Sequence, residues 1–283
     1  MEVASNQIDS SWKLISIGVL IVLLAWETAA PFFPYFVRKL RFRTVHAFRN
    51  LALGVVNALA VSIGLVHLWG WAAETCTEKS FGVLNWAGLS GWGGALVAVL
   101  LFDLWTYWWH RLNHEVPLLW RFHQVHHSDP QMDVTTANRF HLGEIVLSSL
   151  LRVPVIFLIG AEFWHLALYE VILFPVVQFH HANIRVDGWV GRMLRWFIAT
   201  PEMHKVHHSR WQPETDSNYT SLLSVWDRVF RTFRLREAPS QISFGLDGYD
   251  DTGSQKLRGV LTAPFRFGKP TVEAVSQEKA PDE

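Results

Sequence analysis

Histidines gather directly after an apolar run of this chain, LVAVLLFDLWTYWW, in the segment HRLNHEVPLLWRFHQVHH. Their spacings are HxxxH and then HxxHH, and HxxHH recurs in the later segment MHKVHH. In an α-helix, HxxxH puts two imidazoles on one face, and HxxHH adds a third imidazole beside such a pair. Two such helices can enclose metal ions. The histidines in these motifs are His110, His114, His123, His126, His127, His204, His207 and His208.

Eight imidazoles are too many for one metal ion, which takes about four to six ligands, so the motifs predict two ions. Imidazole suits zinc, iron, copper and nickel, and the residue type alone does not choose among them. The single cysteine, Cys76, excludes an intrachain disulfide and a cysteine-based zinc site. A solvated histidine-rich surface is the alternative interpretation. Because these histidines lie beside apolar runs and recur in one spacing, ligation is favoured.

The composition and the apolar runs predict an all-α integral membrane protein. Half of the residues are hydrophobic and 15 are tryptophan, while the formal charge of zero gives no basic field for nucleic acid. Three runs, at about residues 12–30, 51–71 and 89–109, suit full transmembrane helices of about 20 residues. The basic segment RKLRFR between the first two runs predicts a cytoplasmic loop. The third helix then reaches His110 at the cytoplasmic face.

Two shorter apolar pieces follow, at about residues 145–160 and 163–179. Each is short for a full span, so we expect a hairpin of one or two further membrane helices that turns at Gly160. Such a hairpin returns His181 to the same side of the membrane as His110. A helical cap on the cytoplasmic side would then hold a histidine-rich site for two metal ions.

The chain divides into three regions by composition. We expect an N-terminal transmembrane region over residues 1–95 and a histidine-rich domain over residues 96–236. Residues 237–283 form a tail rich in glycine, serine, proline and charge, which we expect to be partly disordered. Within the histidine-rich domain, Arg192 and Arg195 stand next to apolar residues, which predicts a segment resting on anionic headgroups.

Asp103 lies inside the third apolar run, at helical spacing from His110 and His114. An ionisable residue inside an apolar helix predicts a functional role, and carboxylates commonly orient metal-bound imidazoles. We therefore predict that Asp103 supports a histidine one or two turns further along the helix. The alternative is a helix-capping or interhelical hydrogen bond.

The motifs HRLNH, HQVHH and TPEMHKVHH, followed by NYTSLLSVWDRVFRTF, resemble the fatty acid hydroxylase and sterol desaturase superfamily of membrane-bound, histidine-box diiron oxygenases. The segments HQVHHSD, TTANRFH and QFHHANI are similar to those of the alkylglycerol monooxygenase subgroup and its bacterial members. By spacing alone, His141 and His181 are either ligands or interfacial polar residues. The resemblance implies that both are ligands, that Glu144 supports the site and that His180 is an extra residue. Arg231 stands where members usually carry glycine.

The resemblance also implies that residues 96–236 form a catalytic domain of this superfamily, and it implies a chemistry. Two iron ions, which zinc can replace in an isolated protein, would use O2 and electrons from a separate donor protein to hydroxylate a C–H bond of a membrane lipid. The lipid would be a fatty acyl chain, a sterol or an ether lipid. A lipid or sterol desaturase would use the same site, whereas a zinc-dependent membrane hydrolase would need an open coordination position, and a metal transporter would place ionisable residues through the membrane. We expect a multi-pass protein of a bacterial cytoplasmic membrane, with the metal site on the cytoplasmic side.

Overall fold

The computed structural model describes residues 2–186 and 188–266. Within these ranges the protein is all-helical, as predicted, and the only β-type pairing is a single bridge between Ile198 and Leu223. The α-helices are α1 (Glu2–Ala29), α2 (Leu40–Ala60), α3 (Val66–Lys79), α4 (Val83–Trp86), α5 (Gly91–Glu115), α6 (Pro117–His127), α7 (Leu142–Ile159), α8 (Phe163–His181), α9 (Gly188–Phe197), α10 (Pro201–His207), α11 (Gln212–Thr215), α12 (Val225–Val229) and α13 (Leu257–Thr262).

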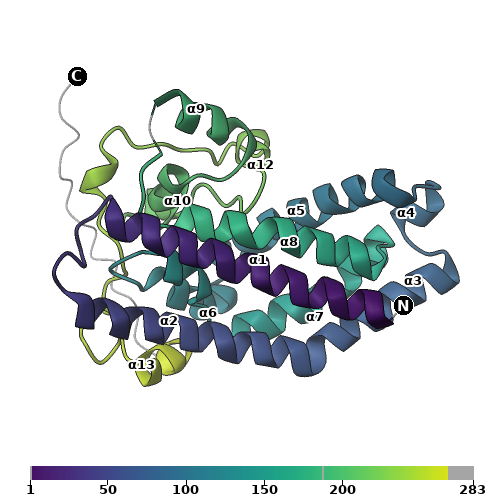
Figure 1. The fold of residues 1–283 in the computed structure, drawn as a ribbon, viewed down its shortest axis with the longest axis horizontal. Coiled ribbons are helices and arrows are strands. Elements are labelled where there is room, and N and C mark those ends of the chain that lie inside the picture. Colours follow the sequence, from purple (N-terminus) through teal and green to yellow (C-terminus); the bar gives the residue numbers. More distant parts are fainter. Residues whose placement is uncertain (1, 187, 267–283) are drawn as a thin grey trace.

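The long helices α1, α2, α7 and α8 lie side by side along one direction, and the histidine-bearing α6 and α10 lie at one end of them (Figure 1). Helix α8 packs against both α1 and α5, and α3 packs against α7. The main core forms between α3, α5, α7 and α8, where Trp69, Phe102, Ile156 and Tyr169 are buried. The long helices therefore form a scaffold that carries the histidines at one end.

Two helical stretches, Leu40–Trp86 and Leu142–Ile159, are long and apolar enough to cross a membrane, and the apolar part of α1, Leu14–Ala29, is shorter. Large apolar side chains point outward from these helices, including Ile63 and Leu158, which are 76% and 62% exposed. Such surfaces suit contact with lipid. Helix α7 is thus long enough to cross a membrane, although its apolar run was expected to be short for a full span. The number of membrane passes stays a prediction.

The segment RKLRFR does not remain a loop over its whole length. Helix α2 begins at Leu40, inside this segment, and a π-helical turn at Val61–Leu65 joins α2 to α3 without a break. The helical stretch is therefore longer at both ends than the apolar run 51–71. The apolar run marks only the part of the helix without charged residues, so it sets no limit on where the helix begins.

Gly160 makes the predicted turn between α7 and α8. Its φ of 75° lies in the left-handed region, and a Cβ there would approach the Phe81 carbonyl oxygen to 2.5 Å. Only glycine fits such a position. Two of the charged residues that interrupt the hairpin, Arg152 and Glu170, form an ion pair between α7 and α8.

The region after residue 236 is not a loose tail as far as the structure describes it. Ile242 and Phe244 are buried against α10 and the loop between α1 and α2, and Val260 of α13 packs against Val125 of α6. The few apolar residues of this segment are far apart in a polar sequence, so its composition did not predict that they would be buried. The part of the predicted disordered tail that covers residues 267–283 lies outside the described residues.

Arg231 occupies the turn in which the superfamily pattern carries glycine. Its φ of 60° is left-handed, a conformation that costs a residue with a side chain on the order of 1 kcal/mol. The turn is held by the backbone, since the N–H groups of Thr232 and Phe233 both donate to the Asp227 carbonyl oxygen, at 2.7 and 3.0 Å. The turn geometry is therefore kept despite the substitution.

Candidate metal centre

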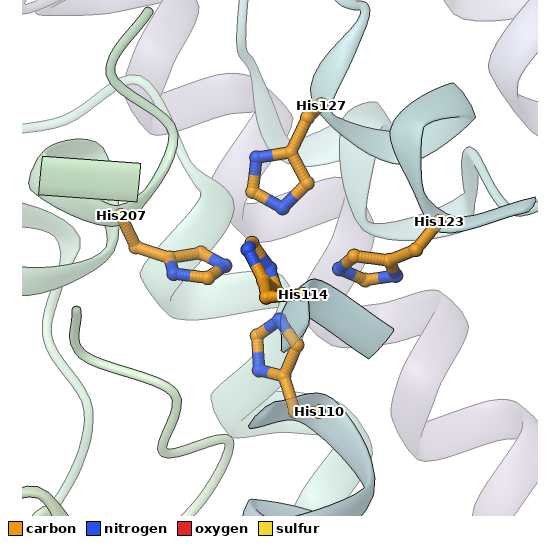
Figure 2. A group of neighbouring side chains, drawn as sticks. All are labelled: His110, His114, His123, His127 and His207. Carbon is orange, nitrogen blue, oxygen red and sulfur yellow. The ribbon is translucent and has the colours of Figure 1, made fainter. Parts of the chain in front are cut away.

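One group of histidines combines residues from α5, α6 and α10. One nitrogen of each lies within 4.8 Å of a nitrogen of every other member. Figure 2 shows the five rings converging on one point. The members of this group, which we call the five-histidine group, are His110, His114, His123, His127 and His207.

The Nε2 atoms of the five-histidine group are all buried and make no hydrogen bond with the described protein. Three of these rings are held by hydrogen bonds of their outward-facing Nδ1 atoms. Nδ1 of His110 donates to the Tyr219 carbonyl oxygen and Nδ1 of His207 donates to the Ser217 carbonyl oxygen, both at 2.7 Å. Because a carbonyl oxygen only accepts, these Nδ1 atoms carry the proton and Nε2 presents a lone pair to the centre.

Glu144 holds a third ring of this group. Its Oε1 accepts from Nδ1 of His123 at 2.8 Å, and both side chains are buried. The structure thus places Glu144 where the resemblance implies a supporting carboxylate. A carboxylate in this position fixes the ring orientation and raises the basicity of the inward nitrogen.

The second group, which we call the four-histidine group, contains His126, His181, His204 and His208. The Nε2 atoms of His126 and His204 each lie 3.0 Å from Nε2 of His181, and those of His204 and His208 lie 3.1 Å apart. Imidazole nitrogens that share one metal ion at about 2.0–2.1 Å lie roughly 3.0–3.4 Å apart. Nδ1 of His181 donates to the Val177 carbonyl oxygen at 2.7 Å, so its Nε2 presents a lone pair. The donor set therefore fits a metal ion.

Each HxxHH motif serves both groups. In α6, His123 and His127 belong to the five-histidine group while His126 belongs to the four-histidine group. At the end of α10 the division is reversed, with His207 in the first group and His204 in the second. Neighbouring residues of a helix point about 100° apart. The adjacent histidines of the motif can therefore face two different ions.

Burial keeps the imidazoles of His126 and His207, one from each group, in the neutral form. Burial and then the neighbouring His208 lower the pKa of His126 well below its usual value. Burial also lowers the pKa of His207 to about 3, against the opposing hydrogen bond to Ser217. A neutral imidazole is the form that binds a metal ion. Each unpartnered buried nitrogen costs on the order of 1 kcal/mol or more, which ligation would offset.

The structure does not bring His141 to either group, contrary to what the resemblance implies. His141 is the N-cap of α7, where its Nδ1 accepts from the Gly143 backbone N–H at 2.9 Å. Its Nε2 donates to the Leu261 carbonyl oxygen of α13 at 3.1 Å. Both ring nitrogens are therefore engaged in holding α7 and the C-terminal segment together.

Asp103 makes no hydrogen bond or ion pair with a histidine among the described residues, so the prediction that it orients one is corrected. Its Oδ2 accepts from Trp226 Nε1 at 2.8 Å and from the Leu223 backbone N–H at 3.0 Å. The Tyr169 hydroxyl donates to Oδ1 at 3.4 Å. The alternative interpretation, an interhelical hydrogen bond, therefore holds for Asp103. Its carboxylate connects α5 and α8 to the segment that also carries Tyr219.

His180 lies buried against the four-histidine group without joining it. Its ring centroid is 3.9 Å from that of His204 and 4.7 Å from that of His181.

The ligand-orienting carbonyl groups of Ser217 and Tyr219 were not identified from the sequence. A backbone carbonyl group is present in every residue type, so the sequence does not mark these two. Only their position after the last histidine motif could have suggested their role.

A buried polar network outside the histidine motifs holds the loop that follows α6. Asp129 accepts from His46 Nε2 at 2.9 Å and from Asn50 Nδ2 at 3.2 Å, both on α2. The hydroxyl of Thr136 donates to the same carboxylate at 2.8 Å. Asp129 follows His127 by two residues, so α2 helps to fix the end of the helix that carries three of the ligands.

Arg139 completes this network and is only 1% exposed. Its guanidinium donates to the Val125 carbonyl oxygen and the Ser128 hydroxyl, both at 3.0 Å, and to Asn50 Oδ1 at 3.1 Å. It also donates to Gln255 Oε1 of the C-terminal segment at 2.9 Å. One buried cation thus joins α2, the end of α6 and the C-terminal segment.

Removal of the Glu144 carboxylate should weaken metal binding at the five-histidine group. We expect Glu144→Ala to reduce metal affinity about 10- to 100-fold, because His123 loses the acceptor that fixes its ring. Glu144→Gln keeps one acceptor oxygen and should fall between Glu144→Ala and the wild type. Metal retained during titration with a chelator measures the effect. An equal loss in Glu170→Ala, whose partner is Arg152, would indicate general destabilisation instead.

The sequence model of the family described as fatty acid hydroxylase matches residues 95–232. The histidine-rich part of the chain is therefore similar to the fatty acid hydroxylase family. This confirms the resemblance drawn from the motifs. The family segment contains all nine histidines of the two groups and Glu144, whereas His46, Asn50 and Gln255 lie outside it.

Several lipid-modifying proteins are similar to this chain. Alkylglycerol monooxygenase of Xenopus tropicalis is 36% identical over 139 residues, which are 46% of this chain and 28% of that protein. The human alkylglycerol monooxygenase is 31% identical over 163 residues, 58% of this chain and 34% of its own length. Ornithine lipid hydroxylase of Rhizobium tropici is 30% identical over 191 residues, 65% of this chain and 56% of its own length. The chain thus spans about a third to a half of these relatives, and no solved structure matches it.

Proposed function

We propose that this protein is a membrane-bound hydroxylase that inserts oxygen from O2 into a C–H bond of a lipid, with electrons from a separate donor protein. The observation that carries the proposal is the division of nine histidines, eight of them buried, into groups of five and four. The similarity to an alkylglycerol monooxygenase and an ornithine lipid hydroxylase supports a lipid as the substrate.

The two groups would each hold one iron ion, since imidazole is a suitable ligand for iron. When bound, the two ions would supply the activation of O2 and the oxidation of the C–H bond. The chain itself performs the positioning. Glu144 and the carbonyl groups of Ser217 and Tyr219 hold ligand rings in place, and burial keeps bulk water away from the centre.

The proposal includes a position in the membrane. Helices α1, α5 and the stretch from α2 to α3 would span the bilayer, and α7 and α8 would form the membrane hairpin. The basic segment at the start of α2 lies at the same end as α6 and α10 (Figure 1). Because basic loops stay in the cytoplasm, the metal centre and the helical cap would be cytoplasmic, in a bacterial cytoplasmic membrane.

Expression in a host that lacks a counterpart, followed by mass spectrometry of the extracted lipids, tests this proposal. We expect a lipid species that gains one oxygen atom, carries the label when cells grow under ¹⁸O₂, and is absent without O2. The His126→Ala, His207→Ala double variant, with one ligand removed from each group, should not form it. Loss of two hydrogens from a lipid would identify a desaturase. A product that forms equally without O2 would contradict the proposal.

A further inference from the structure

Helix α9 connects two elements that carry ligands of the four-histidine group. It begins seven residues after His181 at the end of α8, and it is followed by α10, which carries His204. In Figure 1, α9 lies at the periphery of the molecule, near α12. Gly191 lies on the inner, buried face of α9, which is closely packed, because a Cβ on this residue would lie 1.9 Å from the Val186 carbonyl oxygen.

The outer face of α9 is apolar and exposed. Trp189, Met193, Trp196 and Phe197 are 68%, 46%, 66% and 65% exposed. Their spacing of four, seven and eight residues from Trp189 places all four on one side of the helix. Four large apolar side chains on a ten-residue helix form a surface that requires a covering partner.

Basic side chains border this face. Arg192 and Arg195 follow Trp189 by three and six residues, which puts them along one edge of the apolar face. The segment GWVGRMLRWF contains no acidic residue. Arg228 of α12 adds a third guanidinium, which lies over the Trp196 ring at 4.7 Å and donates to the Arg195 carbonyl oxygen at 2.6 Å. The exposed edge is therefore cationic.

We propose that α9 is a docking helix that lies in the surface of a lipid bilayer containing anionic headgroups. Tryptophan prefers the boundary between acyl chains and headgroups, and arginines beside it pair with lipid phosphates. The same chain provides two helical stretches of membrane-crossing length, which would place a bilayer next to the molecule. Docking of α9 would hold His181 and His204 close to the headgroup layer. The inference requires a membrane-bound chain and is independent of the reaction at the histidines.

Fluorescence quenching on the full chain in lipid nanodiscs tests this inference. A bimane label is attached at Met193→Cys in a Cys76→Ser background, and the discs contain phosphatidylglycerol and a lipid with a nitroxide near its headgroup. The control label is at Thr252→Cys, an exposed position in the C-terminal segment. We expect lipid quenching at position 193 to exceed that at position 252 on the order of threefold, with the reverse order for aqueous iodide.

Two other results would overturn the inference. Strong iodide quenching without lipid quenching at position 193 would mean that the apolar face is solvated. Shielding from both quenchers would mean that a second copy or another protein covers it. The charge component is tested by the Arg192→Gln, Arg195→Gln pair, which should reduce lipid quenching in phosphatidylglycerol discs but not in neutral discs. Equal quenching of the pair and the parent in both discs would contradict anionic recognition.

A protein that shows lipid quenching but forms no oxygenated lipid would contradict the proposed hydroxylase and leave the docking helix intact. The opposite pattern, with an oxygenated product and no lipid quenching, would contradict only the docking helix. The two proposals can therefore fail separately.

Discussion

His204→Ala is expected to cost the protein one of its two metal ions. Nε2 of His204 lies 3.0 Å from that of His181 and 3.1 Å from that of His208, so its loss removes the central donor of the four-histidine group. The five-histidine group shares no ligand with it and should keep its ion. We expect turnover to fall at least about 100-fold, beyond the loss caused by removal of a supporting residue. Metal analysis of the purified variant, together with lipid product formation, measures both effects.

His141→Ala is the matched control for this experiment. His141 is also a buried histidine of the family segment, but its two nitrogens are engaged by Gly143 and Leu261. The His141→Ala protein should therefore retain both metal ions. Loss of an ion from His141→Ala would return this residue to the ligand set that the resemblance implies. Full metal content in His204→Ala would contradict the four-histidine group.

Arg139→Met is expected to reduce the free energy of unfolding by about 3–5 kcal/mol, because removal of one member of a buried charged network leaves its partners unsatisfied. The partners that lose a donor include Asn50, Ser128 and Gln255, and the Asp129 carboxylate loses a nearby positive charge. The melting temperature of the purified protein in detergent should fall on the order of 10 °C.

Arg258→Met on α13 provides the comparison, because Arg258 is exposed. Its melting temperature should stay within about 1 °C of the wild type, as is usual for surface substitutions. An Arg139→Met protein as stable as the wild type would show that the network adds nothing to stability. A large effect in both variants would point to a general sensitivity of α13 and its contacts.

The local features of the site could be predicted from the sequence because they depend on helix geometry. The spacing within HxxHH decides which face each imidazole occupies, so eight histidines already indicated two ions. The structure explains the adjacent pairs, such as His126 and His127, as ligands directed to different groups. Apolar runs likewise predicted the helices, because a long apolar run satisfies its backbone hydrogen bonds within a helix.

Partners from distant parts of the chain could not be predicted. Asp103 shares a helical face with His110, yet its carboxylate bonds to Trp226, 123 residues away in the sequence. His141 stands in a family motif, yet the packing of α13 supplies Leu261 as its partner. Tertiary packing determines such contacts, and neither the spacing of residues nor the composition of the chain predicts how distant segments pack. The same reason hid the role of α2 in holding Asp129.

The metal content of the purified wild-type protein, reconstituted with ferrous iron and then freed of loosely bound metal, tests the central claim most directly. Inductively coupled plasma mass spectrometry should find two iron ions per chain, one for each histidine group. A content of one ion or fewer per chain would contradict the assignment of nine histidines to two metal ions.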